Sequence, residues 1–253
     1  MDYWNTIAHP HWICLSALIS EINARFSGKE NEILHPGEFD VFAKIRSQSY
    51  RESWFAGRVL TKNLYMQQSV PVRPIDWREI QIVSRNDAGR SVAPRLLAGG
   101  KETGFFFSLS HVADRVAVVA LVDSFAGIGC DLVLRGTTTQ GIVNMFFHDD
   151  EVQDQSNLDA VWAVKEAVYK ACQCNESFQP RQWLTKNIGE NRYCCHHVDG
   201  DRQLFAEAET VDIDDYILAV ARKTSECYSG SIFKFALDTA ADKTTSSLLS
   251  GEG

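Results

Sequence analysis

The stretch "VWAVKEAVYKA" at residues 161–171 joins an apolar helical pattern to three charged side chains. Residues three and four apart are neighbours on a helix. One face is apolar and is expected to pack in a core: Val161, Val164, Val168 and Ala171. The other face gathers Trp162, Lys165, Glu166, Tyr169 and Lys170. Glu166 and Lys170 are therefore either an ordinary surface ion pair or parts of a site.

Length and composition indicate a folded protein of one large domain or two closely packed halves. The chain has 253 residues, of which 45% are hydrophobic and 11% aromatic, enough to bury a sizeable core. No apolar run is long enough for a membrane span. The first residues lack the basic and apolar pattern of a signal peptide, and "HWICLSALI" at 11–19 predicts a buried helix.

The seven cysteines are an odd number without C-x-x-C spacing, which favours a reducing compartment, the cytoplasm, over a disulfide scaffold. "YCCHHVD" at 193–199 holds four residue types that bind zinc, but their spacing does not fit a structural zinc site. Adjacent strand residues also point to opposite faces. We therefore interpret the segment as an edge strand.

Charge is unevenly distributed along a chain whose net charge is −8. Eleven basic residues against four acids lie between Lys44 and Lys101, and seven acids against one base lie between Asp123 and Ala160. The total disfavours nucleic-acid binding. A basic half opposite an acidic half would suit a metal-bound polyanion, although chance surface charge explains the asymmetry equally well.

A long helix is predicted over residues 39–67, ended by Pro71 and Pro74. One stripe of this helix is small and aliphatic and should be core. The other is either a solvated face or a phosphate-binding wall: Arg51, Trp54, Phe55, Arg58, Lys62 and Tyr65.

Strands and turns follow in both halves. We expect strands at 79–84, at 104–123 with a turn at Ser110-His111, around "GIGCDLV" (127–133), and in three segments between 192 and 223. A turn and irregular loop should follow Asp87, and helices should cover 137–153 and 158–173. The acid-led segments 114–123 and 214–223 resemble each other, which suggests two related halves.

Asp131 stands alone in an apolar strand and needs a partner, because an unpaired buried charge is costly. That partner is an arginine, a backbone cap or a divalent metal. A second carboxylate such as Glu166, with phosphate oxygens and water, would satisfy Mg²⁺. His111 is a candidate phosphate donor or a structural histidine.

Taken together, these segments resemble the 4'-phosphopantetheinyl transferases, of the large single-chain, surfactin-synthetase-activating type. The resemblance spans about residues 40–225. The matching segments are "RESWFAGR" (51–58), "DAGRS" (87–91), "FSLSH" (107–111), "GIGCD" (127–131), "FFHDDE" (146–151) and "WAVKEAVYK" (162–170). Since the last of these is the opening stretch, the site interpretation of Glu166 and Lys170 is favoured.

The resemblance implies an α+β fold, a pseudo-twofold arrangement of two similar halves with the active site in the cleft between them. Residues 1–125 would contact the phosphates and adenine of coenzyme A, residues 126–235 would carry the metal and catalytic groups, and 236–253 would be a disordered tail. It also implies Mg²⁺-dependent transfer of phosphopantetheine from coenzyme A to a serine of an apo acyl or peptidyl carrier protein, releasing 3',5'-ADP. A cytoplasmic monomer that binds neither nucleic acid nor membrane is expected.

The family's roles carry over residue by residue. Asp131 and Glu166 would bind Mg²⁺, and the catalytic set would be Asp131, Glu151, Glu166 and Lys170. Glu166, a metal-bound water or Glu151 would accept the serine proton. The residues expected to bind coenzyme A are Arg46 (or Lys44), Arg51, Arg58, Gly89, Arg90, Ser110, His111, Lys165 and Lys170.

One position departs from the family. Many large-type members carry an acid two residues after the strand aspartate, where this chain has Val133. We therefore expect a metal shell of two acids, diphosphate and extra water. The alternatives are a catalytically silent homologue that binds carrier protein or coenzyme A without transfer, and an unrelated metal-dependent nucleotide-binding protein.

Overall fold

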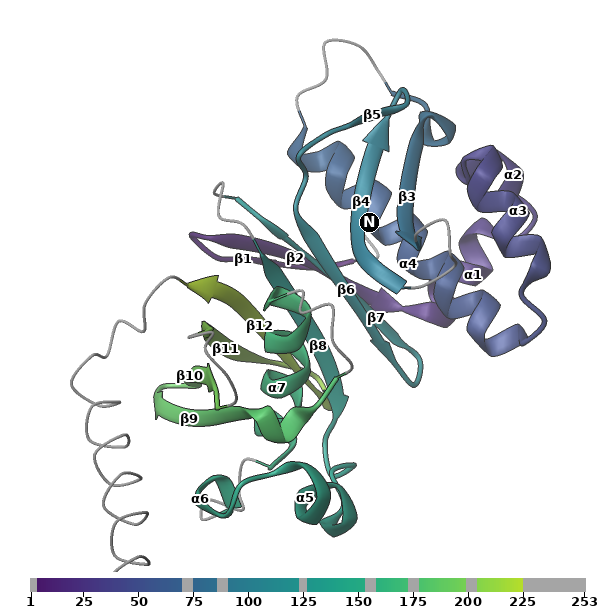
Figure 1. Ribbon diagram of the computed structural model, residues 1–253. Helices are drawn as coiled ribbons and strands as arrows, with labels where there is room; N and C mark the ends of the chain where they lie inside the picture. Colours follow the sequence, from purple (N-terminus) through teal and green to yellow (C-terminus); the bar gives the residue numbers. More distant parts are fainter. Residues whose placement is uncertain are drawn as a thin grey trace, which may run out of the picture.

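The computed structural model describes residues 4–69, 75–85, 91–122, 127–152, 158–172, 178–198 and 204–224. Within these ranges the chain is a mixed α+β protein built on antiparallel sheets, so the predicted α+β class is confirmed. Figure 1 shows two groups of elements on either side of the region where β6, β7 and β8 meet. No described helix is long and apolar enough to cross a membrane.

The N-terminal sheet has the order β1-β2-β7-β6. Its strands are β1 (Asn5–Ala8), β2 (Trp12–Leu18), β6 (Phe107–Val112) and β7 (Arg115–Leu121). Four helices lie between β2 and β6 in the chain: α1 (Ile19–Phe26), α2 (Glu30–Ile33), α3 (Pro36–Lys44) and α4 (Gln48–Gln68). A 3-10 helix and a small sheet follow: η1 (Trp77–Glu79), β3 (Ile80–Arg85), β4 (Ser91–Ala98) and β5 (Lys101–Glu102).

The C-terminal sheet has the order β8-β12-β11-β10-β9. Its strands are β8 (Ile128–Leu134), β9 (Trp183–Gly189), β10 (Arg192–His197), β11 (Phe205–Ile213) and β12 (Tyr216–Thr224). The helices between β8 and β9 are α5 (Gln140–Phe146), α6 (Asp149–Val152), α7 (Leu158–Cys172) and the 3-10 helix η3 (Pro180–Gln182).

Apolar side chains form three buried layers. One lies between α4 and the N-terminal sheet, and a second between α7 and the C-terminal sheet. The third joins the two sheets, with Cys14 and Val119 from one meeting Leu132 and Val220 from the other. The two acid-led segments form β7 and β12, and each pairs with the strand that precedes the helices of its own half.

The predicted helix at 11–19 is wrong, because residues 12–18 form strand β2. Its backbone pairs with β1 on one side and β7 on the other. Leu15 faces the α4 layer and Cys14 faces the layer between the sheets. A short apolar run that is buried on both faces has no period that separates strand from helix.

The predicted helix at 39–67 is two helices, α3 and α4. Ile45 and Ser47 are extended, and the Ser47 hydroxyl accepts from the amide of Tyr50 at 3.3 Å. Ser47 is thus the N-cap that starts α4. The Arg51 guanidinium donates to Ile45 O at 2.6 Å and holds the bend.

Smaller corrections concern the strands. Residues 91–98 form β4 rather than an irregular loop, and β10 lies between β9 and β11 rather than at an edge. The turn expected at Ser110-His111 falls at Ala113, whose φ is 49°. The helix predicted over 137–153 is the two short helices α5 and α6. The tail predicted at 236–253 lies outside the described residues.

Candidate active site

Two glycines let α7 lie directly on β8. A Cβ at Gly129 would come within 1.9 Å of Ala167 O, and one at Gly127, where φ is +94°, within 2.5 Å of Ala171 O. No side chain fits at such distances. The close contact places the polar groups of α7 over Asp131, which β8 presents toward the helix.

Asp131 is buried, with 5% of its surface exposed, and one of its oxygens serves two donors. Its Oδ1 accepts from the Ser110 hydroxyl at 2.7 Å and from Lys170 Nζ at 2.7 Å. Lys170 also donates to Cys130 O at 3.0 Å, and its side chain is 32% exposed. The partner that Asp131 needs is therefore a lysine four residues beyond Glu166, in place of the arginine or backbone cap considered from sequence.

Glu166 joins Asp131 in an acid pair. Burial, together with the negative charge and hydrogen bonding of Asp131, raises the pKa of Glu166 to about 7. Burial alone would lower the pKa of Lys170, but Asp131 and the other neighbouring anionic groups outweigh burial and raise it. The cluster of Asp131, Glu166 and Lys170 thus holds one exchangeable proton near neutral pH.

The acid pair opens into a cavity of about 240 Å³. His111, from β6, lines the cavity together with the two carboxylates. Its apolar wall is formed by Val112, Leu132, Val133, Ile142 and Trp162. Elements of both halves of the chain therefore line one cavity.

Two serines join the halves beside this cavity. The Ser108 hydroxyl accepts from Cys130 N at 3.0 Å, and the Ser110 hydroxyl accepts from Leu132 N at 3.2 Å. Both serines lie on β6, at the edge of the N-terminal sheet, and both amides lie on β8, at the edge of the C-terminal sheet. Serine side chains of one sheet therefore provide hydrogen-bond acceptors for backbone amides of the other. Ser110 thereby holds Asp131 from the opposite half.

Three predicted site residues lie inside the protein instead. Lys165 is fully buried, 2.8 Å from Glu151 Oε1, and neither residue lines the cavity. Arg58 is also buried, 3.3 Å from Glu38 Oε1 and 4.2 Å from the centre of the Trp54 ring. The polar stripe of α4 is therefore neither a solvated face nor a phosphate-binding wall at Arg58.

The other basic candidates lie elsewhere. Arg51 is committed to the bend between α3 and α4 and lies 5.3 Å from the Phe42 ring centre. Arg46 is exposed in that same bend, as is Lys44 at the end of α3. Gly89 and Arg90 lie outside the described residues.

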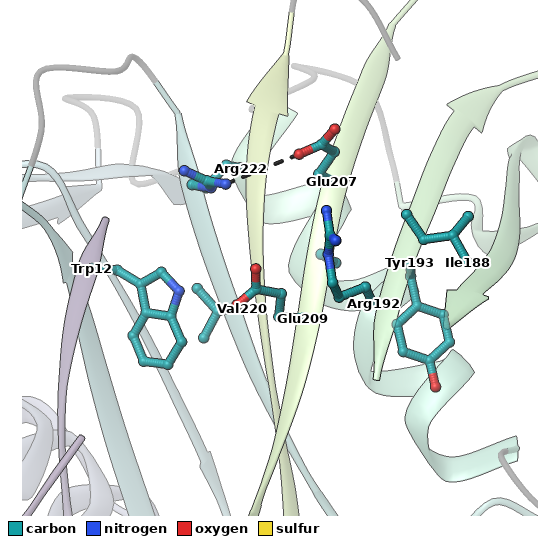
Figure 2. A pocket seen from close by; sticks show the side chains of 9 residues that line it. Trp12, Ile188, Arg192, Tyr193, Glu207, Glu209, Val220 and Arg222 are labelled. Atoms are coloured by element: carbon teal, nitrogen blue, oxygen red, sulfur yellow. Dashed lines mark ion pairs between the residues drawn. The ribbon is translucent and has the colours of Figure 1, made fainter. Parts of the chain in front are cut away.

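The described part of the stretch at 193–199, residues 193–198, is not arranged as a metal site. Cys194 is disulfide-bonded, while Cys195 is a buried free thiol whose Sγ lies 3.5 Å from Thr185 Oγ1. On the face of the same sheet that is turned toward β2, a hollow of about 10 Å³ is bordered by Trp12 and by the 4.0 Å ion pair of Arg222 and Glu207 (Figure 2). That is room for about one water molecule.

The donor set at the cavity fits a small hard cation. In the part of the chain that the structure describes, no three His, Cys, Asp or Glu side chains converge as a metal site. Two carboxylates that share a proton are nevertheless a set from which a cation can displace that proton. Val133 supplies an apolar wall at the place of a third acid.

Comparison with known families points to the same region. Residues 127–221 match the model of the 4'-phosphopantetheinyl transferase superfamily. The match contains Asp131, Glu166 and Lys170 and supports phosphopantetheine transfer as the general class of activity. No curated protein matches the chain.

Sequence reasoning missed part of the cavity. Thr137, Thr138 and Ile142 line it, and no spacing in the sequence marks them beyond their position just after the Asp131 strand. The role of Ser108 was also missed, although the residue lies in a matched segment. Its function depends on a strand that is distant in sequence.

Proposed function

We propose that the protein transfers the 4'-phosphopantetheine group of coenzyme A to a serine of an apo carrier protein and releases 3',5'-ADP. The observation that carries this proposal is the cluster of Asp131, Glu166 and Lys170, whose two carboxylates line the 240 Å³ cavity. The family match over the same residues supports it.

In the proposed reaction the serine oxygen attacks the phosphorus that bears the pantetheine arm. A new serine–phosphate bond forms, and the bond to the phosphate of 3',5'-ADP breaks. Glu166 or a water bound to the metal accepts the serine proton, because both would lie beside the reacting diphosphate. Lys170 and His111 could both donate hydrogen bonds to the oxygens of the diphosphate.

Mg²⁺, held by Asp131 and Glu166, would neutralise charge on the diphosphate. Lys170 donates to Oδ1 of Asp131 at 2.7 Å and so holds that carboxylate in place beside Glu166. Glu151 pairs with Lys165 and is not among the residues that line the cavity, which favours Glu166 over Glu151 as the base.

We also propose the large single-chain subtype, a pseudo-twofold relation between the halves, and a cytoplasmic monomer. The cavity supports the single-chain subtype and the monomer, because β6 of one half and β8 and α7 of the other line it within one chain. The cytoplasmic location rests on the odd cysteine count without C-x-x-C spacing. Analytical ultracentrifugation tests the monomer.

The test is intact-mass spectrometry of apo carrier proteins of several classes, incubated with the protein, coenzyme A and Mg²⁺. A gain of about 340 Da on the carrier is expected. Glu166→Gln should abolish it, whereas Glu102→Gln, on the exposed strand β5, should not. Bound coenzyme A with no mass gain on any carrier would favour the silent homologue.

A further inference from the structure

The ion pair of Lys165 and Glu151 holds three elements against α7. Lys165 Nζ lies 2.8 Å from Glu151 Oε1 and also donates to Pro180 O at 3.1 Å and to Trp183 O. Both side chains are essentially unexposed. We call this arrangement the C-terminal lock.

Glu151 uses its remaining capacity on backbone amides. Its Oε2 accepts from His148 N at 2.7 Å, and its Oε1 accepts from Thr185 N at 2.6 Å. The lock thus ties α6, α7, η3 and β9 together, and its polar groups are satisfied internally.

The N-terminal half contains the same device around α4. Lys62 Nζ lies 2.6 Å from Glu38 Oε2 and donates to Ile33 O at 2.8 Å and to Trp77 O at 3.1 Å. Glu38 accepts from backbone amides as well, at 3.0 and 2.9 Å, from His35 and Ile82. We call this the N-terminal lock.

The two locks agree in spacing along the chain. In each, the glutamate takes the amide of the histidine three residues before it. In each, the lysine donates to the carbonyl fifteen residues after it, Trp77 or Pro180. The strand amide bound by the glutamate is twenty residues beyond the lysine, at Ile82 or Thr185.

The helices that carry the two locks differ at the positions of the candidate catalytic residues. One and five residues after the lysine, α7 carries Glu166 and Lys170, whereas α4 carries Asn63 and Gln67. Gln67 Nε2 donates to Asn63 Oδ1 at 3.1 Å. The strand β2 faces α4 with apolar residues such as Leu15. The lock therefore occurs both with and without the acid pair.

We propose that Lys165 and Glu151 are positioning residues, one of two copies of a structural lock, which seat α7 so that Glu166 and Lys170 meet Asp131. The positioning role rests on the proposed function. The existence of two equivalent locks does not. Lys165, although part of the matched segment, then makes no contact with coenzyme A.

Variants of both locks test this. Lys165→Met leaves Glu151 buried without its cation, which should lower Tm by about 10 °C. The double variant Glu151→Gln/Lys165→Met should lose less than the sum of the single changes. Lys62→Met should lower Tm less, because Arg58 still faces Glu38.

Kinetics and binding separate positioning from ligand contact. Below its Tm, Lys165→Met should lower kcat at least tenfold with little change in KM for coenzyme A, and Lys62→Met should change neither. Lys165→Arg should not restore kcat, because Lys165 is fully buried and a planar guanidinium cannot reproduce the contacts of a compact ammonium group. An exposed phosphate contact would accept arginine. A tenfold rise in KM or Kd for coenzyme A with unchanged Tm would overturn the proposal.

A measurement independent of transfer keeps the two proposals distinct. Mn²⁺ binding to Asp131 and Glu166, followed by electron paramagnetic resonance, should weaken in Lys165→Met and not in Lys62→Met. If the wild-type protein transfers nothing, the proposed function fails. The Mn²⁺ measurement would still show whether the C-terminal lock positions Glu166 relative to Asp131. Equal Mn²⁺ affinity in Lys165→Met and wild type would refute the positioning role.

Discussion

Among single residues, the site is organised around one carboxylate oxygen, Oδ1 of Asp131. Ser110 and Lys170 both donate to Oδ1 of Asp131. Burial and the nearby charge of Asp131 raise the pKa of Glu166 to about 7. Like charges in a partly buried site cannot both be carried without a cation. A divalent cation that replaces the proton of Glu166 would neutralise the repulsion between the carboxylates of Asp131 and Glu166.

Stability should depend on the protonation of Glu166. Its pKa is about 7 in the folded protein, against an ordinary 4.5, so the folded state binds more protons in between. The free energy of unfolding should therefore fall as pH rises from about 4.5 to about 7, and level off above. Urea unfolding across this range measures it. Glu166→Gln should flatten this slope, and an unchanged slope in that variant would contradict the assignment.

Val133 should limit the affinity for a cation. Val133→Glu places a third carboxylate on the strand face of Asp131, in the cavity wall. Added ligand charge should raise Mg²⁺ affinity about tenfold, measured by isothermal titration calorimetry. Val122→Glu adds the same charge at a side chain that is 55% exposed and should change nothing. Equal affinities for all three proteins would exclude position 133 from the metal shell.

At the scale of elements, the distance between α7 and β8 decides whether the site forms. Gly129→Ala would place a methyl group against the Ala167 carbonyl. Because backbone must move, we expect a loss of about 3 kcal/mol in unfolding free energy and loss of transfer. Gly57→Ala is the matched control, since its Cβ would lie 3.7 Å from Leu109 Cδ1. Chemical denaturation should find that control neutral or stabilised by about 1 kcal/mol.

How far the sequence predicted the structure also depends on the element. Local periodicity placed Asp131 on a strand and Glu166 and Lys170 on one helix face, and the structure brings these three residues together. Lys165 was placed on the polar face by the same periodicity, yet its stem is buried because Glu151 reaches it from another element. Strand β2 was misjudged because only its neighbours in the sheet distinguish it from a helix.

At the scale of the whole molecule, the halves are joined by side chains as well as by apolar packing. Arg115, at the start of β7, pairs with Asp214 in the turn before β12 at 2.5 Å. The serines of β6 bind amides of β8. Unfolding of one half should therefore release the other.

Ser108→Ala tests this connection. The buried amide of Cys130 would lose its acceptor, at a cost of about 1–3 kcal/mol, with one cooperative transition retained in calorimetry. Ser53→Ala, whose hydroxyl donates within its own helix, should cost less than about 0.5 kcal/mol. Equal effects of the two changes would show that the serine bridge, the hydrogen bonds of Ser108 and Ser110 to amides of β8, does not couple the halves.

The serine bridge also bears on solubility. Strands β6 and β8 each lie at one edge of their sheet, and an open strand edge is a template for aggregation. In the intact chain each covers the other. A chain divided between Leu121 and Ile128 would expose both, one of them carrying Asp131 with its partner Ser110 gone. Keeping both halves in one polypeptide therefore protects each from self-association as well as building the cavity.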